Sequence, residues 1–423
     1  MILTDPHKTV AIVVQQHAED TAVLRHTRSV LVRAPHVKLL HLARIDERIA
    51  AQLDGLAVAG DNGAVLCDAA LEMPGVGEVF AGAVGAVTRK DRARLDKLFS
   101  LAGAETEVKR GLISAFGWVS AYDLKGTVAE LLAAEEPIHQ EVGIAACIMH
   151  RIDPGTILAQ AIGDPDVALR ARALRAIGEA GRRDLLNDCL RHLRDEDATS
   201  RFCAAASALL LGDRDRSLGV LGDFAAHPGP CREHALRLWL MATDLPSSHR
   251  MLKTLAREPA DRRPLIQGVG IAGDVQLIPW LIGLMADDKV ARLAGESFST
   301  ITGLDLGYLD LERNPPEDFE SGPTDDPDDP NVDMDPDESL PWPDQSKIQS
   351  WWNANGSSLR AGVRYFMGEP VSPSHCHRVL REGYQRQRRV AAGYLCLLAP
   401  GTPLFPTAAP AWRQARWLDE LPR

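Results

Sequence analysis

The chain has 423 residues, and 45% of them are hydrophobic, which is enough to bury a sizeable core. Aromatic residues make up only 5%, and a composition dominated by Ala, Leu, Arg and Glu favours helices. No apolar run is long enough to span a bilayer, and the first residues lack the pattern of a secretory signal peptide. We therefore expect a helical cytoplasmic protein with no membrane partner.

The net charge of −11 is concentrated in one segment. Residues 310–345 contain fourteen acidic residues and a single basic one, Arg313, so the rest of the chain carries a net charge of only +2. DNA- and RNA-binding proteins carry basic surfaces that neutralise phosphates. This charge distribution does not favour nucleic acid as a partner.

Residues 1–102 show helical patterns without a regular interval. In the stretch LLHLARIDERIAAQLDGL, apolar residues fall on one helical face, namely Leu39, Leu42, Ile45, Ile49 and Leu53. We interpret residues 1–102 as a helical N-terminal cap, which an array of repeats needs to cover its first apolar face.

A motif then recurs over residues 103–305. One copy reads PDVALRARALRAIGEAG, and equivalent anchor positions recur every 29 or 31 residues at Arg110, Glu141, Arg170, Arg201, Arg232, Arg263 and Arg292. Three residues after each anchor comes a small or aliphatic residue: Ile113, Ile144, Ala173, Ala204, Ala235, Ile266 or Gly295. About 30 residues accommodate two short helices and two turns. We predict an all-α solenoid of seven helix pairs, each covering the apolar face of its neighbour.

The copy DPDVALRARALRAIGEAG resembles the HEAT-like repeat of α-solenoid proteins. In that family an Asp six residues before the anchor Arg pairs with it in a ladder between adjacent repeats, and this Asp is present here as Asp164 for Arg170 and Asp195 for Arg201. The resemblance implies an inter-repeat ladder of Asp164, Arg170, Asp195, Arg201 and Arg232. The Asp is missing before Arg232, Arg263 and Arg292, so the sequence leaves open what pairs with these arginines.

Residues 306–345 are rich in Pro and carboxylates, which disfavours helices and strands. We predict an acidic loop there with three alternative roles. It is a surface loop without function, a weak site for divalent cations, or a strap across a basic groove that mimics or gates a partner. The candidate partner-binding residues are Asp325, Asp326, Asp328, Asp329 and Trp342.

Residues 346–423 return to helical patterns and are predicted to form a C-terminal cap. Four segments resemble one proteobacterial family whose genes tend to lie beside type VI secretion spike and tip genes: LARIDERIAAQLDGL, ARLAGESFSTITGLDL, SGPTDDPDDP with SLPWPD, and APGTPLFPTAAPAWRQ. This resemblance implies association with the secretion machine. It carries over no catalytic residues.

Candidate metal ligands are scattered. Seven cysteines at irregular spacing favour reduced, buried thiols. The pairs Cys147/His150 and Cys231/His234 fall at different positions of the repeat, three units apart, so we do not expect one zinc ion to join them. In SHCHRVL (residues 374–380), a helix start with Ser374 as its N-cap is favoured over a metal site.

No nucleophile elbow, phosphate-binding loop or His-Glu iron-binding dipeptide occurs, so no catalytic, cofactor or metal site is predicted. We expect a non-enzymatic scaffold or adaptor that presents a concave surface to another protein. By resemblance, that partner is a type VI secretion spike, a tip protein or a toxin. The alternatives are a HEAT-like metal-dependent enzyme and, as a weaker reading, a DNA-binding solenoid.

Overall fold

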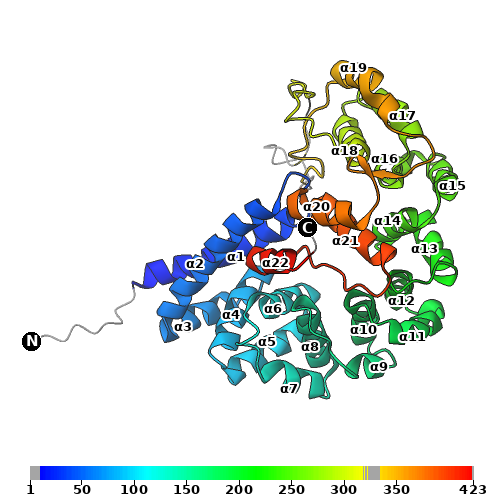
Figure 1. Ribbon diagram of the computed structural model, residues 1–423. Helices are drawn as coiled ribbons and strands as arrows, with labels where there is room; N and C mark the ends of the chain where they lie inside the picture. Colours follow the sequence, from blue (N-terminus) through cyan, green and yellow to red (C-terminus); the bar gives the residue numbers. More distant parts are fainter. Residues whose placement is uncertain (1–9, 318, 320–321, 323–333, 422–423) are drawn as a thin grey trace, which may run out of the picture. The chain divides into compact units, whose positions relative to one another are not determined.

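The computed structural model describes residues 10–317, 319, 322 and 334–421 (Figure 1). The chain forms two compact units. The first consists of Met1–Gly212 with Ala399–Pro422, and the second of Asp213–Leu398. Nearly all regular structure in the described residues is helical, and the only paired strands there are the short hairpin β1 (Tyr365–Phe366) and β2 (Glu369–Pro370). The predicted all-α solenoid is confirmed.

The α-helices of the first unit follow one another in chain order. They are α1 (Ala11–Leu31), α2 (Leu39–Val58), α3 (Asp61–Ala70), α4 (Val76–Thr88), α5 (Arg92–Ala104), α6 (Thr106–Trp118), α7 (Thr127–Ala133), α8 (Pro137–Met149), α9 (Ile157–Ala161), α10 (Val167–Ala180), α11 (Leu186–Arg191), α12 (Ala198–Leu210) and, from the C-terminal end of the chain, α22 (Ala411–Asp419).

The second unit contains the remaining α-helices. They are α13 (Arg216–Ala226), α14 (Arg232–Ala242), α15 (Leu245–Leu255), α16 (Arg262–Ala272), α17 (Ile278–Leu284), α18 (Ala291–Thr302), α19 (Gln345–Asn355), α20 (Pro373–Glu382) and α21 (Gln385–Leu398).

All seven repeat anchors lie on helices, from Arg110 on α6 to Arg292 on α18. A second helix, no longer than the anchor helix, follows each of the first six anchor helices, as the predicted pairs require. The residue three positions after the anchor is fully buried in five copies, at Ile144, Ala173, Ala204, Ala235 and Ile266. These small and aliphatic residues let adjacent anchor helices pack closely, as α10 does on α8 and α12. Among the described residues, the next helix after the seventh anchor helix is α19 (Gln345–Asn355), which lies beyond the Pro-rich acidic segment.

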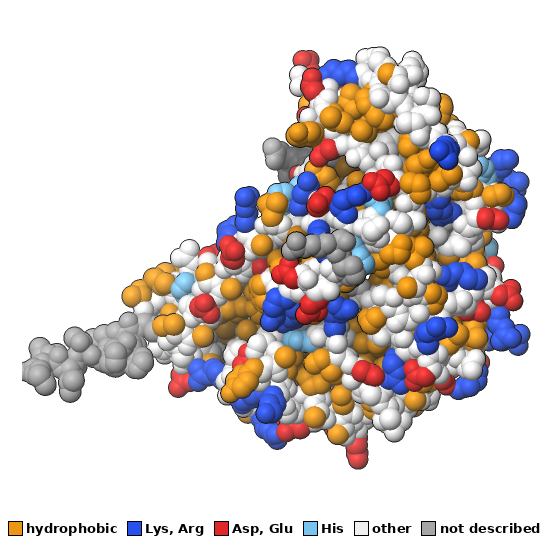
Figure 2. Space-filling view, viewed as in Figure 1, with side chains coloured by type: hydrophobic (Ala, Val, Ile, Leu, Met, Phe, Trp, Pro, Cys, Tyr) orange, Lys and Arg blue, Asp and Glu red, His pale blue; other side chains and the backbone are white. Residues whose placement is uncertain are grey.

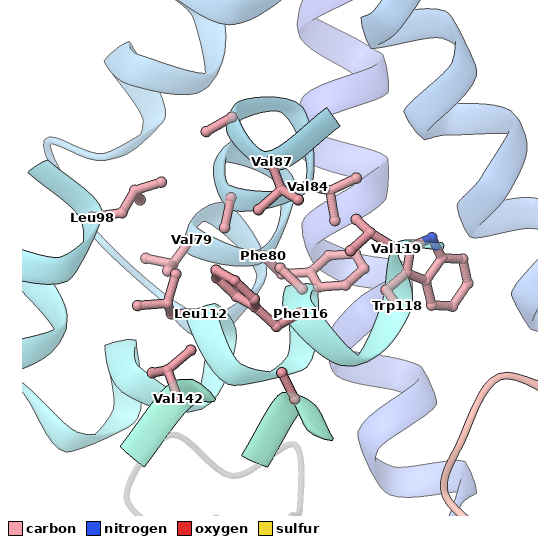
Figure 3. Packing of buried hydrophobic residues seen from close by; sticks show 14 of the residues in the cluster. Val79, Phe80, Val84, Val87, Leu98, Leu112, Phe116, Trp118, Val119 and Val142 are labelled. Atoms are coloured by element: carbon pink, nitrogen blue, oxygen red, sulfur yellow. The ribbon is translucent and has the colours of Figure 1, made fainter. Parts of the chain in front are cut away.

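The N-terminal helices share one core with the first repeats. Buried residues extend without interruption from Leu24 to Ala146, and Phe80 and Trp118 meet edge to face with ring centroids 5.7 Å apart (Figure 3). Leu98 and Leu112 lie in the same core on either side of residue 102, the predicted boundary of the cap. The packing therefore has no break at that boundary.

The predicted C-terminal cap is not one body. Residues 346–398 pack in the second unit, whereas residues 399–422 belong to the first. We call residues 399–421 the C-terminal arm. Its helix α22 lies against α2, and the sequence patterns of α20, α21 and α22 gave no indication of this division because all three are amphipathic.

The C-terminal part of the chain caps helix ends in both units. In the first unit, the Leu404 amide donates to the carbonyl of Glu179 on α10 (2.9 Å). In the second, the amides of Tyr365 and Met367 donate to Gly273 (2.8 Å) and Thr300 (2.7 Å), at the ends of α16 and α18. The last carbonyls of a helix have no partner within it, so these contacts satisfy groups that an isolated repeat leaves open.

Candidate partner-binding sites

The ladder in the first unit centres on Asp195. Its carboxylate accepts from the Arg170 guanidinium at 3.0 and 3.3 Å, and its backbone carbonyl accepts from Arg201 Nη1 at 2.6 Å. Arg170 Nη1 also donates to the backbone carbonyl of Asp164 (2.7 Å), whose carboxylate instead accepts from the Asp166 amide (2.8 Å). Arg170 and Arg201 thus each contact their own Asp through its backbone carbonyl, and the carboxylate of Asp195 reaches back to the preceding repeat.

These contacts alter the titration of Asp195. Burial raises the pKa of its carboxyl, but hydrogen bonds from His192 and Arg170 outweigh burial, so the pKa lies below its usual value. Asp195 is therefore ionised at neutral pH and can serve as the counter-charge of Arg170.

In the second unit the anchor arginines pair with carboxylates other than that of an Asp six residues earlier. Arg232 binds Asp261 through two hydrogen bonds of 2.6 and 2.5 Å. Arg263 binds Asp337 in the same bidentate way at 2.6 and 2.7 Å. Arg292 contacts Asp335 at 2.5 Å. Asp335 and Asp337 come from the acidic segment, so this segment replaces the aspartates that the last repeats lack.

Trp342 lies inside this arrangement. Only 8% of its surface is exposed, and the guanidinium of Arg292 stacks 4.6 Å from its ring centroid. Arg313 lies at 5.3 Å from the same ring. Cation–π contacts of this kind fasten the ring in place. Its surroundings identify Trp342 as an internal anchor of the acidic segment rather than an exposed partner contact.

The two ends of the acidic segment are also joined to each other. The Arg313 amide donates to the carbonyl of Trp342 (2.8 Å), and the Asp344 amide donates to the carbonyl of Leu311 (2.9 Å). Leu311 and Arg313 therefore lie beside Trp342 and Asp344 in the second unit. The candidate residues Asp325, Asp326, Asp328 and Asp329 lie outside the described residues.

Within the part of the chain that the structure describes, no three His, Cys, Asp or Glu side chains converge as a metal site. His150 Nε2 lies 2.9 Å from the carbonyl of Phe116, and burial together with the charge of Arg413 lowers the pKa of His150 to about 4. Ser372, not Ser374, caps α20 by accepting from the His375 amide (3.3 Å), so the predicted cap is wrong. Pro373 takes the first helical position, which moves the cap one residue ahead of it.

The first unit contains a cavity of about 840 Å³. Its walls come from α2, α3, α4 and α22, and from the segment that follows α6. Its apolar floor includes Leu71, Val84 and Leu98, all nearly buried. Trp118 and Trp412 meet at one side with ring centroids 4.7 Å apart.

The helix α22 is held in place beside this cavity by buried polar groups. Asp46, fully buried on α2, accepts from the Ala411 amide (2.6 Å) and pairs with Arg28. Arg413 donates to the carbonyls of Gly117 (2.7 Å) and Val119 (3.0 Å) at the end of α6. The cavity wall formed by α22 is thus a firmly bound element.

Sequence reasoning missed this cavity. The glycine-rich stretch PGVGEVFAGAVGAV indicates close helix packing, which is correct for Gly77, because an added Cβ there would strike Ala22. At Gly85, however, an added Cβ would meet nothing within 4 Å, and this residue lines the cavity. The periodicity shows that α4 is a helix, but it does not reveal which of its glycines face open space.

Residues 156–238 match the family model for HEAT repeats. The match includes the anchors Arg170, Arg201 and Arg232. HEAT repeats commonly act as scaffolds for protein interactions and are typically non-enzymatic. No curated protein and no solved structure was found to match the chain.

The surface agrees with the charge balance of the sequence. On the face shown in Figure 2, Lys and Arg side chains are interspersed with Asp and Glu rather than gathered in one basic stripe. No helix among the described residues is long and apolar enough to cross a membrane.

Proposed function

We propose that this protein is a non-enzymatic scaffold or adaptor in the cytoplasm that binds a type VI secretion spike, a tip protein or a toxin before export. The HEAT-like fold supports the general role, and the resemblance of four segments of the sequence supports the choice of partner. The acidic segment is proposed to contact a basic surface of that partner and to add electrostatic selectivity.

The observation that carries this proposal is the attachment of the acidic segment. Residues 314–334 contain eight acidic residues and no Lys or Arg. The ends of this stretch are fixed by the pairing of Arg313 with Trp342 and by the ion pair between Arg292 and Asp335. A basic partner surface would be attracted to a segment of this charge.

Neutralising the acidic run tests the proposal. Asp325, Asp326, Asp328 and Asp329 are replaced together by Asn, and tagged chain is used to recover partners from lysate of the native host. We expect the wild type to recover a type VI secretion component and the variant to recover about tenfold less at physiological salt.

A control with the same loss of charge separates local from general electrostatics. It carries Asp96→Asn, Glu105→Gln, Glu135→Gln and Glu136→Gln, all at exposed positions in the first unit. This control is expected to recover the partner normally. If the wild type recovers no secretion component, the proposed function is wrong; if the Asn variant binds normally, the acidic contact is wrong.

Two measurements address the alternatives. Stoichiometric iron or zinc in the purified protein would favour a metal-dependent enzyme, and salt-dependent binding of duplex DNA would favour a DNA-binding solenoid. The adaptor proposal expects neither result.

A further inference from the structure

Three helices present regularly spaced side chains to the cavity of the first unit. On α2 the lining residues include Ala50, Leu53 and Ala57, at positions i, i+3 and i+7. On α22 and its C-cap they include Trp412, Arg416 and Glu420, at i, i+4 and i+8. These intervals are the ones by which a helix presents one face to a neighbouring helix.

The third wall, α4, offers room for a close approach. Gly82 and Gly85 line the cavity on this helix, and α3 adds Gly63 and Ala64. Small residues on facing helices allow axes to approach to about 8 Å. Because a Cβ at Gly85 would enter open space, the surface of α4 is not filled there by the protein's own side chains.

Charged side chains of both signs line the cavity beside its apolar residues. Four of them are exposed: Asp54, Arg89, Arg416 and Glu420. Two of these four are acidic and two are basic. An apolar seam flanked by charges of both signs is the arrangement found between paired amphipathic helices.

We infer that this cavity binds an amphipathic α-helix of the partner protein, whose apolar face packs between α2, α4 and α22. The inference rests on the proposed adaptor function and names the part of the partner that is recognised. The first unit already binds one helix at this place, because α22 is seated beside the cavity by Asp46 and Arg413. The partner helix continues that packing, with its charged flanks opposite Asp54 and Arg416.

The charges also distinguish a helix from a compact small ligand. Pockets for small ligands combine an apolar lining with a few polar groups that converge on the ligand. Here four charged lining residues are exposed, whereas Arg94 is already paired with Asp68 (3.0 Å) and the buried Arg413 donates to carbonyls at the end of α6. This arrangement fits a long ligand with polar flanks.

Filling the cavity from inside tests the inference. In Gly85→Leu the new side chain enters the open space, so the helix is kept while the groove is blocked. Gly219→Leu is the matched control, since Gly219 on α13 is exposed and its Cβ would also meet nothing within 4 Å. We expect Gly85→Leu to weaken recovery of the secretion component about tenfold or more, with Gly219→Leu at the wild-type level.

A photo-crosslinking amino acid in place of Thr88, which lines the cavity, identifies the occupant. We expect a cross-link to a partner peptide with apolar residues at i, i+3, i+4 and i+7. Cross-links only to a small molecule, to residues 1–9 of this chain or to a second copy would overturn the inference.

The two proposals fail differently. Normal recovery by Gly85→Leu, or recovery by the wild type without a cross-link at residue 88, overturns the helix groove and leaves the adaptor function standing. Absence of any secretion component in the wild-type recovery overturns both.

Discussion

Buried arginines recur in this protein, and each described one has oxygen acceptors. Arg388 is fully buried and donates to the carbonyl of Leu380 (2.7 Å), and Arg413 is 5% exposed and donates to carbonyls at the end of α6. Removing a guanidinium from water costs several kcal/mol unless hydrogen bonds replace the lost hydration. The anchor arginines of the repeats follow the same rule, using carboxylates such as Asp195 and Asp261.

The pair of Arg232 and Asp261 is predicted to make stability depend on pH. The hydrogen bond from Arg232 holds the pKa of Asp261 below its usual value. A carboxyl with a depressed folded-state pKa contributes stability above its unfolded pKa of about 3.9 and loses it as the pH falls through the lower folded value. We expect Asp261→Asn to lower the free energy of unfolding by about 1–3 kcal/mol at pH 7.

The difference in unfolding free energy between Asp261→Asn and the wild type should persist down to about pH 4. It should shrink below that pH, where the wild-type carboxyl is itself protonated. Urea denaturation of both proteins across this range measures it. If the difference in unfolding free energy stayed constant to the lowest pH, the ion pair of Arg232 and Asp261 would not be the cause of it.

At the level of helices, several anchor helices end at a glycine against which another segment packs. Gly181, Gly273 and Gly303 follow α10, α16 and α18 with positive φ of 71°, 69° and 75°. An added Cβ at these positions would overlap backbone atoms of Gly401, Tyr365 and Met367, respectively. The glycines therefore serve two purposes: they end the helix in the left-handed conformation, and they admit the C-terminal part of the chain.

Alanine substitutions separate these two purposes. Gly126 has a positive φ of 86° but open space around its Cβ position, so Gly126→Ala should cost only the left-handed strain, about 1 kcal/mol. Gly181→Ala adds a collision with the Gly401 carbonyl, and we expect at least twice that loss of unfolding free energy. Equal losses in chemical denaturation would mean that the arm moves away freely.

At the scale of the whole chain, the two units differ in how they are completed. The second consists of consecutive residues, whereas the first requires the C-terminal arm, which returns from the far end of the sequence. The arm contributes Ala411 to the main core and supplies caps for α6 and α10. The stability of the first unit is thus tied to residues that follow the second unit in sequence.

Removing the arm is predicted to affect one unit selectively. In a chain ending at Leu398, Asp46 loses the Ala411 amide, and the last carbonyls of α6 lose Arg413. We expect faster amide hydrogen exchange in α2, α6 and α10, with exchange in α14, α16 and α18 unchanged. Comparable loss of protection in both groups of helices would contradict the division into two units.

Local periodicity made the repeats predictable from the sequence. The carboxylates that pair with the anchor arginines could be predicted for some repeats but not for others. The interval and the small residue three positions later are properties of neighbouring residues in sequence, so the helices around Arg170 and Arg201 follow directly. Asp195 stands at the expected place in the repeat, but Asp335 and Asp337 lie 43 and 74 residues from the arginines they bind. The acidic composition suggested a strap over basic groups, but it did not identify Asp335 and Asp337 as the residues involved.

The amino-acid order alone was sufficient for the helical class, the repeat interval and the location of the acidic segment, because each depends on spacing within about thirty residues. Three features were decided only by folding. They are the unit in which the C-terminal arm packs, the carboxylates that complete the ladder, and the open space at Gly85. Each of these depends on which distant surfaces meet, and an amphipathic helix such as α22 carries the same pattern whichever apolar surface it covers. The cavity is therefore a consequence of packing rather than of any motif.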